Sequence, residues 1–420
     1  MPTASSDTVG LYFVLALIAA SLGVILYSSV PRPLKTILCV GLALRVIGGL
    51  ARYSVLEVFY DGRGDAVRYY RVGLEYAERF RALDFSPLSD PSLWHSQTWW
   101  GTQFMFFPSG FVLAVIGPTM LGEFIVFSIF AFLGLVALVV AYTRAFPQVA
   151  TSRYAAWLLL FPSLWFWPSS VGKESIMLFG IGMATLGFVG KHGRISVFPL
   201  AAGLATMLSL RPQVAALFIL CAALAHWLTR QHKWSFARVL QGVAILAVGL
   251  TSVWYAGREL GIDSFDAEGL QDFVASDPAR RVRGGSAIEA VSLGWSAAPL
   301  AAINVLFRPF PWEADSPLML LSSAEITGLW LLLLWRRRSV SATVRRWRSS
   351  RFIAFALAFS LIYAIALGLM MSNLAIIARQ RVFFFPFLFL LLEAAPAAAR
   401  AAHARDSLRT ASRHLLVTPN

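Results

Sequence analysis

The stretch from Gly122 to Thr143, GEFIVFSIFAFLGLVALVVAYT, decides the class of this protein. An apolar helix of about 20 residues crosses the roughly 30 Å of hydrocarbon in a bilayer, and this stretch has that length and composition. The rest of the 420-residue chain is similar, because 58% of it is hydrophobic and 14% is charged, against about 25% charged in soluble proteins. The sequence therefore predicts an all-α, polytopic integral membrane protein.

Further apolar runs continue the same pattern along the chain. Full-length runs lie at 9–29, 36–53, 197–210, 213–229, 238–257, 317–335 and 352–372. Shorter runs, or runs interrupted by Pro or Gly, lie at 103–118, 154–168, 174–189, 291–307 and 383–398. The first run has no small-residue cleavage site after it, so we expect a retained span and not a signal peptide. Together the runs predict about 11 to 13 membrane segments in one transmembrane domain over 1–398, followed by a basic tail at 399–420.

The distribution of charge predicts the orientation. Basic residues are concentrated at 32–35, 144–153, 191–194, 230–238, 336–351 and 400–413. Acidic residues outnumber basic ones in the two long polar loops, 54–102 and 258–290. Because cytoplasmic segments carry the excess of Lys and Arg, the two loops are expected outside and the basic tail inside. The number of membrane crossings agrees with this orientation only if the segments 103–118 and 291–307 do not fully cross the membrane. Interrupted segments of this kind are tolerated where they line a cavity, which predicts a site on the external face.

Several other classes of protein are excluded or disfavoured. The two cysteines, Cys39 and Cys221, lie in apolar runs and predict neither a disulfide framework nor a thiolate metal cluster. No carboxylate–histidine ligand set stands out, so no cofactor is predicted, and a divalent metal is left open. The basic run 336–351 is typical of a cytoplasmic loop that contacts anionic membrane lipid, and no nucleic-acid partner is expected.

Two carboxylates open the first external loop, in the sequence Tyr60-Asp61-Gly62-Arg63-Gly64-Asp65. An amphipathic helix is expected to follow, with Asp65 as its N-cap and Tyr69 one turn along. On one interpretation Asp65 only caps this helix and Asp61 only occupies a turn. On the other, one of them is a general base at the mouth of the helix bundle. Trp99 belongs to an aromatic stretch that is either an interfacial belt or a surface for stacking on a sugar, and Tyr69 and Trp99 are the aromatic candidates for substrate contact.

Charged residues recur where several other segments reach the external boundary. The candidates for substrate binding are Lys173, Glu174, Arg211, Arg308, Arg379 and Arg381. Lys173 and Glu174 follow a proline-containing hairpin and either neutralise each other or bind substrate. They are not part of a phosphate-binding P-loop, since Trp167 and Glu174 stand where that motif needs Gly and Ser or Thr. Any one of these arginines could instead extend its side chain so that the guanidinium lies at the membrane–water interface. Together the cations outnumber nearby acids, which favours an anionic ligand such as phosphate.

From about residue 60 to 215 the chain resembles the polytopic glycosyltransferases of the GT-C fold, of the protein mannosyltransferase and aminoarabinose transferase types. The resemblance rests on Gly64-Asp65-Ala66-x-x-Tyr69, on Phe107-Pro108-Ser109-Gly110, on a long span ending Ala141-Tyr142-Thr143-Arg144, and on Pro162-Ser163. It implies a GT-C-like fold, a polyprenyl-phosphate sugar donor, and a catalytic base at Asp65 or Asp61. Near the C-terminal end, Arg379-Gln380-Arg381 also resembles the arginine pairs of O-antigen polymerases and ligases.

The expected function is therefore transfer of a sugar from a polyprenyl-phosphate donor to an external glycan, lipid or protein acceptor. The expected location is a plasma membrane of the bacterial inner-membrane type, with the active site on the external face and a role in cell-envelope polysaccharide biosynthesis. Two alternatives stay open. One is a polysaccharide polymerase or ligase that uses a lipid-pyrophosphate-linked glycan and relies on the arginines. The other is a non-enzymatic lipid or solute transporter.

Overall fold

The structure is a computed structural model of the chain, and it describes residues 4–147, 150–191, 194–229, 247, 298–314, 316–371 and 373–394. Within these ranges every named element is an α-helix or a short 3-10 helix. The all-α prediction is confirmed for the described part of the chain. The predicted span 238–257, except residue 247, and the predicted loop 258–290 and tail 399–420 lie outside the described residues.

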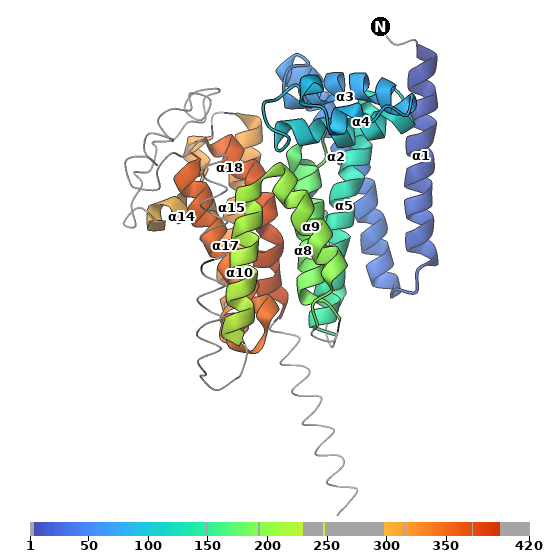
Figure 1. Cartoon of the computed structure of the whole chain (residues 1–420). Helices are drawn as coiled ribbons and strands as arrows, with labels where there is room; N and C mark the ends of the chain where they lie inside the picture. The colour runs from blue at the N-terminus through green and yellow to red at the C-terminus, as the bar shows by residue number, and fades with distance from the viewer. Residues whose placement is uncertain are drawn as a thin grey trace, which may run out of the picture.

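The N-terminal part consists of three long helices and two that lie across their ends. The helices are α1 (Ala4–Tyr27), α2 (Arg32–Tyr60), α3 (Asp65–Arg81), α4 (Thr102–Ile116) and α5 (Met120–Ala145). Figure 1 shows α1, α2 and α5 running along the bundle, with α3 and α4 lying across one end. That is the arrangement expected for a segment at 103–118 that does not cross. The first external loop is shorter than predicted, because α2 continues as a helix to Tyr60 instead of ending at residue 53.

The central part contains the predicted hairpin, with its break at a proline. Its helices are α6 (Thr151–Leu160), α7 (Pro162–Phe166), α8 (Lys173–Val189), α9 (Val197–Leu210) and α10 (Pro212–Thr229). Pro162 is the first residue of α7, a position where its missing N–H costs nothing, and Phe161 before it is extended. Arg211 separates α9 from α10 in the same way, since Pro212 begins the second helix.

The C-terminal part brings α18 towards the end of the bundle where α3 and α4 lie (Figure 1). Its helices are α14 (Ala298–Phe307), α15 (Pro317–Trp335), α16 (Arg337–Val344), α17 (Arg351–Met370) and α18 (Leu374–Gln380). After α18 the chain bends by 51° into a last helix, Phe385–Ala394. Short 3-10 helices lie at Ser86–Leu88, Pro91–Leu93, Pro311–Glu313, Trp347–Ser349 and Arg381–Phe383.

Six helices in the described residues are long and apolar enough to cross a membrane, or seven if the bent pair at residues 374–394 counts as one span. They are α1, α2, α5, α10, α15 and α17. The chain is therefore a multi-pass membrane protein. The prediction of 11 to 13 segments also counted shorter apolar elements such as α4, α9 and α14, which have between 10 and 15 residues.

The two ends of the bundle differ in charge. Residues 28–31, Lys191, Arg194 and residues 336–350 lie at the end opposite to α3 and α4 (Figure 1). Several of the predicted basic clusters lie at or beside these positions, including Arg32, Lys35, Lys191 and the run 336–351. We call this the basic end, and the end covered by α3 and α4 the capped end.

Close packing between α5 and α8 holds the centre of the bundle together. A Cβ atom added at Gly182 would lie 2.0 Å from the carbonyl oxygen of Gly134, so the two backbones touch there. Small residues allow this approach between membrane helices.

We expect Gly182→Ala to lower the thermal unfolding temperature in detergent, because overpacking of this kind costs about 1 to 3 kcal/mol. Gly328→Ala on α15 is the matched control, since a Cβ atom there has nothing within 4 Å among the described residues. Equal melting temperatures for the two variants would show that α5 and α8 do not pack this closely.

Candidate functional site

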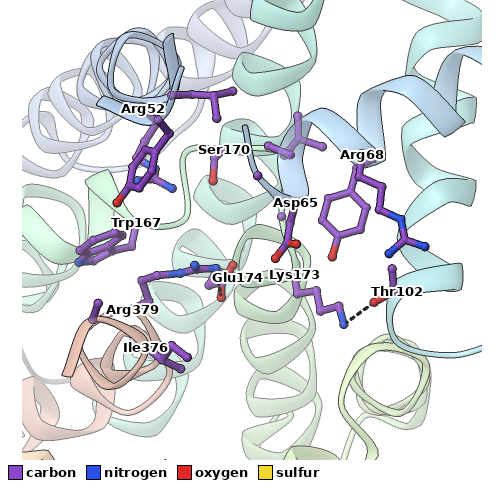
Figure 2. Close-up of a pocket in the computed structure, with 18 of the residues that line it drawn as sticks. Arg52, Asp65, Arg68, Thr102, Trp167, Ser170, Lys173, Glu174, Ile376 and Arg379 are labelled. Carbon is purple, nitrogen blue, oxygen red and sulfur yellow. Dashed lines mark hydrogen bonds and ion pairs between the residues drawn. The ribbon is translucent and has the colours of Figure 1, made fainter. Parts of the chain in front are cut away.

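A cavity of about 510 Å³ lies at the capped end, where α2, α3, α4, α8 and α18 meet (Figure 2). Its lining is strongly cationic. The cations are Arg52, Arg63, Arg68, Lys173, Arg211 and Arg379, and the carboxylates are Asp65 and Glu174. Six positive charges against two negative ones leave a surplus that favours an anionic ligand.

The backbone adds to this positive field, because four helices of 15 to 18 residues begin at the cavity. Asp65 is the first residue of α3, Thr102 of α4 and Lys173 of α8, and Arg211 immediately precedes α10. The first N–H groups of a helix have no partner within the helix, and the helix dipole places partial positive charge there. Helix N-termini are therefore common binding places for phosphate.

Glu174 connects two arginines that are far apart in the sequence. Its Oε1 accepts hydrogen bonds from Arg379 Nη2 at 3.0 Å and from Arg211 Nη2 at 3.3 Å. The carboxylate is buried, with 4% of the residue exposed. Of the two interpretations of Lys173 and Glu174, mutual neutralisation is not what the geometry gives, since Glu174 pairs with the arginines. One carboxylate between two guanidiniums still leaves a net positive charge facing the cavity.

Lys173 and Arg52 have no carboxylate partner in the part of the chain that the structure describes. Lys173 Nζ donates to Thr102 Oγ1 at 3.2 Å, as Figure 2 shows. The Arg52 guanidinium lies 5.2 Å from the ring centre of Phe166 and 5.1 Å from that of Trp167. Its Nε–H is buried and donates to no partner among the described residues. Both cations are therefore available to an anion in the cavity.

Asp65 lines the cavity, but it is not the N-cap of α3 as the sequence predicted. The N-cap is Gly64, whose φ of 142° suits glycine, and Asp65 is the first helical residue with no side-chain capping bond. Its side chain points into the space in front of Lys173 and Glu174 (Figure 2). Among the described residues the Asp65 carboxylate has no hydrogen bond or ion pair in the structure, so it is open to a ligand.

Asp61 lies outside the cavity lining. It follows α2 with a left-handed φ of 48°, and the next N–H, that of Gly62, donates to Leu56 O at 3.0 Å. This is the turn that the sequence predicted for it. The structure thus separates the two carboxylates, and only Asp65 faces the cationic residues.

Tyr69 lines the cavity one turn after Asp65 and is 3% exposed. Burial raises the pKa of Tyr69 above its ordinary value, so the phenol stays neutral and can donate a hydrogen bond. Trp99 does not line the cavity. Its indole donates to Leu88 O at 3.2 Å, and its ring contacts Phe104 and Phe107. Trp99 therefore packs against its neighbours and does not face a ligand in the cavity.

Arg308 and Arg381 also lie outside the cavity lining, contrary to the prediction that all these cations meet. Arg308 Nε donates to Glu313 Oε2 at 3.0 Å. Arg381 is 1% exposed and donates to the carbonyl oxygens of Val305, at 2.6 Å, and of Arg308. Internal partners satisfy both guanidiniums, because neighbouring backbone carbonyls and a carboxylate lie within reach. Arg379 and Arg381 therefore do not act as a pair on one ligand.

The sequence interpretation missed three cations of the lining, Arg52, Arg63 and Arg68. Arg52 lies near the end of the predicted span 36–53 and is not among the predicted site residues. An arginine within an apolar helix is costly and usually has a partner or a ligand, and that signal could have identified it. Arg63 and Arg68 are exposed residues of the first loop, where nothing local distinguishes them from solvated charges.

No family of proteins, no curated protein and no solved structure matched this chain in our comparisons. Within the described ranges no group of three or more His, Cys, Asp or Glu side chains could hold a metal ion. The interpretation of the site therefore rests on its own geometry.

Proposed function

We propose that this protein is a membrane glycosyltransferase that moves a sugar from a polyprenyl-phosphate donor to an external acceptor, with the cavity at the capped end as its active site. The observation that carries the proposal is the meeting, in one cavity, of a carboxylate without a partner, a surplus of cations and the N-termini of four helices. A transfer from phosphate needs a base for the acceptor and a stable site for the anion that leaves.

The cations suit the leaving phosphate. When the acceptor oxygen attacks the anomeric carbon, the bond from that carbon to the phosphate oxygen breaks and polyprenyl phosphate leaves with its electron pair. Lys173, Arg52 and Arg379 face the space where this charge would develop. Fixed donors of this kind typically contribute several kcal/mol to transition-state stability.

Asp65 suits the base. Its carboxylate would take the proton of the acceptor hydroxyl as the new glycosidic bond forms. The proton ends on Asp65, and the negative charge moves from the carboxylate to the departing phosphate. Positioned general bases typically contribute about 10² to 10⁴ in rate. Tyr69, neutral and next to Asp65 on α3, is positioned to hydrogen-bond a sugar or acceptor hydroxyl.

The basic end supports an orientation of the site towards the external side. Cytoplasmic segments carry the excess of Lys and Arg, so the capped end would face the external side of a plasma membrane. We expect a cysteine at Ser86, in the 3-10 helix after α3, to react with a membrane-impermeant maleimide from outside intact cells. A cysteine at Ser341, in α16, should react only after permeabilisation. Labelling in the opposite pattern would put the cavity on the cytoplasmic side.

A lipid-pyrophosphate polymerase or ligase is the second candidate. It is favoured by the six cations that line one cavity, because their total positive charge exceeds the negative charge of a single phosphate. Such an enzyme would depend on the arginines and not on Asp65. Mass analysis of lipid-linked sugars and surface glycans in a deletion strain tests the function itself. Accumulation of a polyprenyl-monophosphate sugar with loss of one sugar from a surface glycan is expected, whereas accumulation of a pyrophosphate-linked oligosaccharide would favour the second candidate.

A further inference from the structure

A second cavity, of about 450 Å³, lies towards the basic end, between α6, the end of α15 and the last helix. We call it the inner groove. Its apolar wall consists of Ala156, Trp157, Leu160, Phe161 and Pro162, and its charged residues are Arg153, Arg336 and Glu393. It shares no lining residue with the cavity that contains Asp65.

One face of α6 forms most of the inner groove. Arg153, Ala156, Trp157 and Leu160 follow the i, i+3, i+4, i+7 spacing that places residues on one side of a helix. The opposite face, with Tyr154 and Leu158, is buried in the core. From Arg153 to Leu160 the helix rises by about 10 Å. The groove therefore passes from a charged end into a wholly apolar region.

The wall of the groove is held firmly by aromatic packing. The Trp157 ring stacks on Phe389 of the last helix with centroids 5.6 Å apart, and Phe161 contacts the same ring at 4.8 Å. Phe389 is fully buried. The apolar wall thus belongs to the core packing and does not depend on a mobile loop.

Positive charges outnumber negative charges in the inner groove. Glu393 Oε1 accepts from Arg336 Nη1 at 3.3 Å and from Trp157 Nε1 at 3.2 Å, so the buried Glu393 is neutralised from within. Arg153 is exposed and forms no ion pair with any described residue. The groove therefore has one surplus positive charge at its mouth and an apolar interior.

We infer that the inner groove binds an anionic glycerophospholipid of the surrounding leaflet, with its phosphate at Arg153 and Arg336 and one acyl chain along Trp157, Leu160 and Phe161. Charge complementarity supports this occupant, because basic pockets between membrane helices at the cytoplasmic side attract anionic headgroups. The apolar wall that continues from Arg153 along α6 suits a lipid chain and not a soluble anion. This inference does not depend on the reaction proposed for the other cavity.

The test is native mass spectrometry of the purified protein in detergent, titrated with phosphatidylglycerol or phosphatidylcholine of the same chains. We expect tighter binding of phosphatidylglycerol at one site. Arg153→Gln should weaken that binding about fivefold, the effect of one basic residue near an anionic lipid. Arg32→Gln, which changes an exposed arginine at the same basic end outside the groove, should leave it unchanged.

A second pair of variants tests the groove itself. Leu160→Trp should fill the groove and abolish the high-affinity site, whereas Leu331→Trp, at an exposed leucine of α15 outside the groove, should not. Melting temperatures of all four variants are compared with wild type to identify misfolded protein.

Three results would overturn the inference. Equal binding of the two lipids by the wild type would show that the groove does not select lipids by the charge of the headgroup. Retention of phosphatidylglycerol by Leu160→Trp would place the lipid on the surface and not in the groove. A dimer that Leu160→Trp converts to monomer, with no selective lipid binding, would assign the groove to a second copy of this chain.

Discussion

Replacement of Asp65 by Asn is expected to reduce sugar transfer by at least about 10²-fold, while the protein inserts normally and melts within a few degrees of the wild type. Asn keeps the size of the side chain but cannot accept a proton. The carboxylate makes no capping bond in α3, so folding loses only its interaction with the helix dipole, about 0.3 to 1 kcal/mol. The measurement is turnover of a lipid-linked sugar by purified protein, alongside its melting temperature.

Asp61→Asn is the matched control. Asp61 belongs to the same loop, is exposed, and lies outside the cavity lining, so its replacement should leave turnover close to wild type. If Asp61→Asn abolishes transfer and Asp65→Asn does not, the base is the other carboxylate. If both variants stay fully active, the first loop supplies no base, and the polymerase or ligase becomes the better candidate.

Arg379→Gln is expected to weaken donor binding by at least about tenfold, since a charge-assisted hydrogen bond contributes about 1.5 to 3 kcal/mol. Arg379→Lys should restore little if the contact uses the planar fork of the guanidinium. Arg308→Gln is the control, because this cation pairs with Glu313 and does not line the cavity.

A double variant separates binding from folding. Arg379 also pairs with Glu174. The Arg379→Gln substitution alone could therefore weaken donor binding indirectly, because the buried Glu174 carboxylate would have one ion-pair partner fewer. Arg379→Gln combined with Glu174→Gln removes both charges together. If donor binding stays weak in the double variant, Arg379 contacts the ligand directly. If the double variant binds as tightly as wild type, Arg379 serves only to balance Glu174, and its assignment to the phosphate is wrong.

Much of the fold could be predicted from the sequence, because apolar runs of membrane length leave few alternatives to helices. The predicted runs 197–210 and 317–335 coincide with α9 and α15. Where α2 ends could not be predicted well. The predicted span ended at residue 53, one residue after Arg52, whereas the helix continues through Glu57 to Tyr60 and ends at the left-handed Asp61.

The candidate site could be predicted only in part, because it is assembled from segments distant in sequence. Lys173, Arg211 and Arg379 were identified by their charge at the ends of apolar runs, and they line one cavity. The same signal wrongly included Arg381, since composition cannot tell an arginine that meets a ligand from one bound to backbone carbonyls. The meeting of four helix N-termini depends on how the helices pack, which no local pattern contains.

Binding of a polyprenyl phosphate in the cavity at the capped end can be tested without knowing the sugar. Binding of polyprenyl phosphate and of the uncharged polyprenol is compared for the purified protein in nanodiscs. We expect polyprenyl phosphate to bind at least about tenfold more tightly than polyprenol, with the preference lost in Arg379→Gln and kept in Arg308→Gln. Equal affinity of the wild type for the two lipids would show that the cavity does not bind the phosphate.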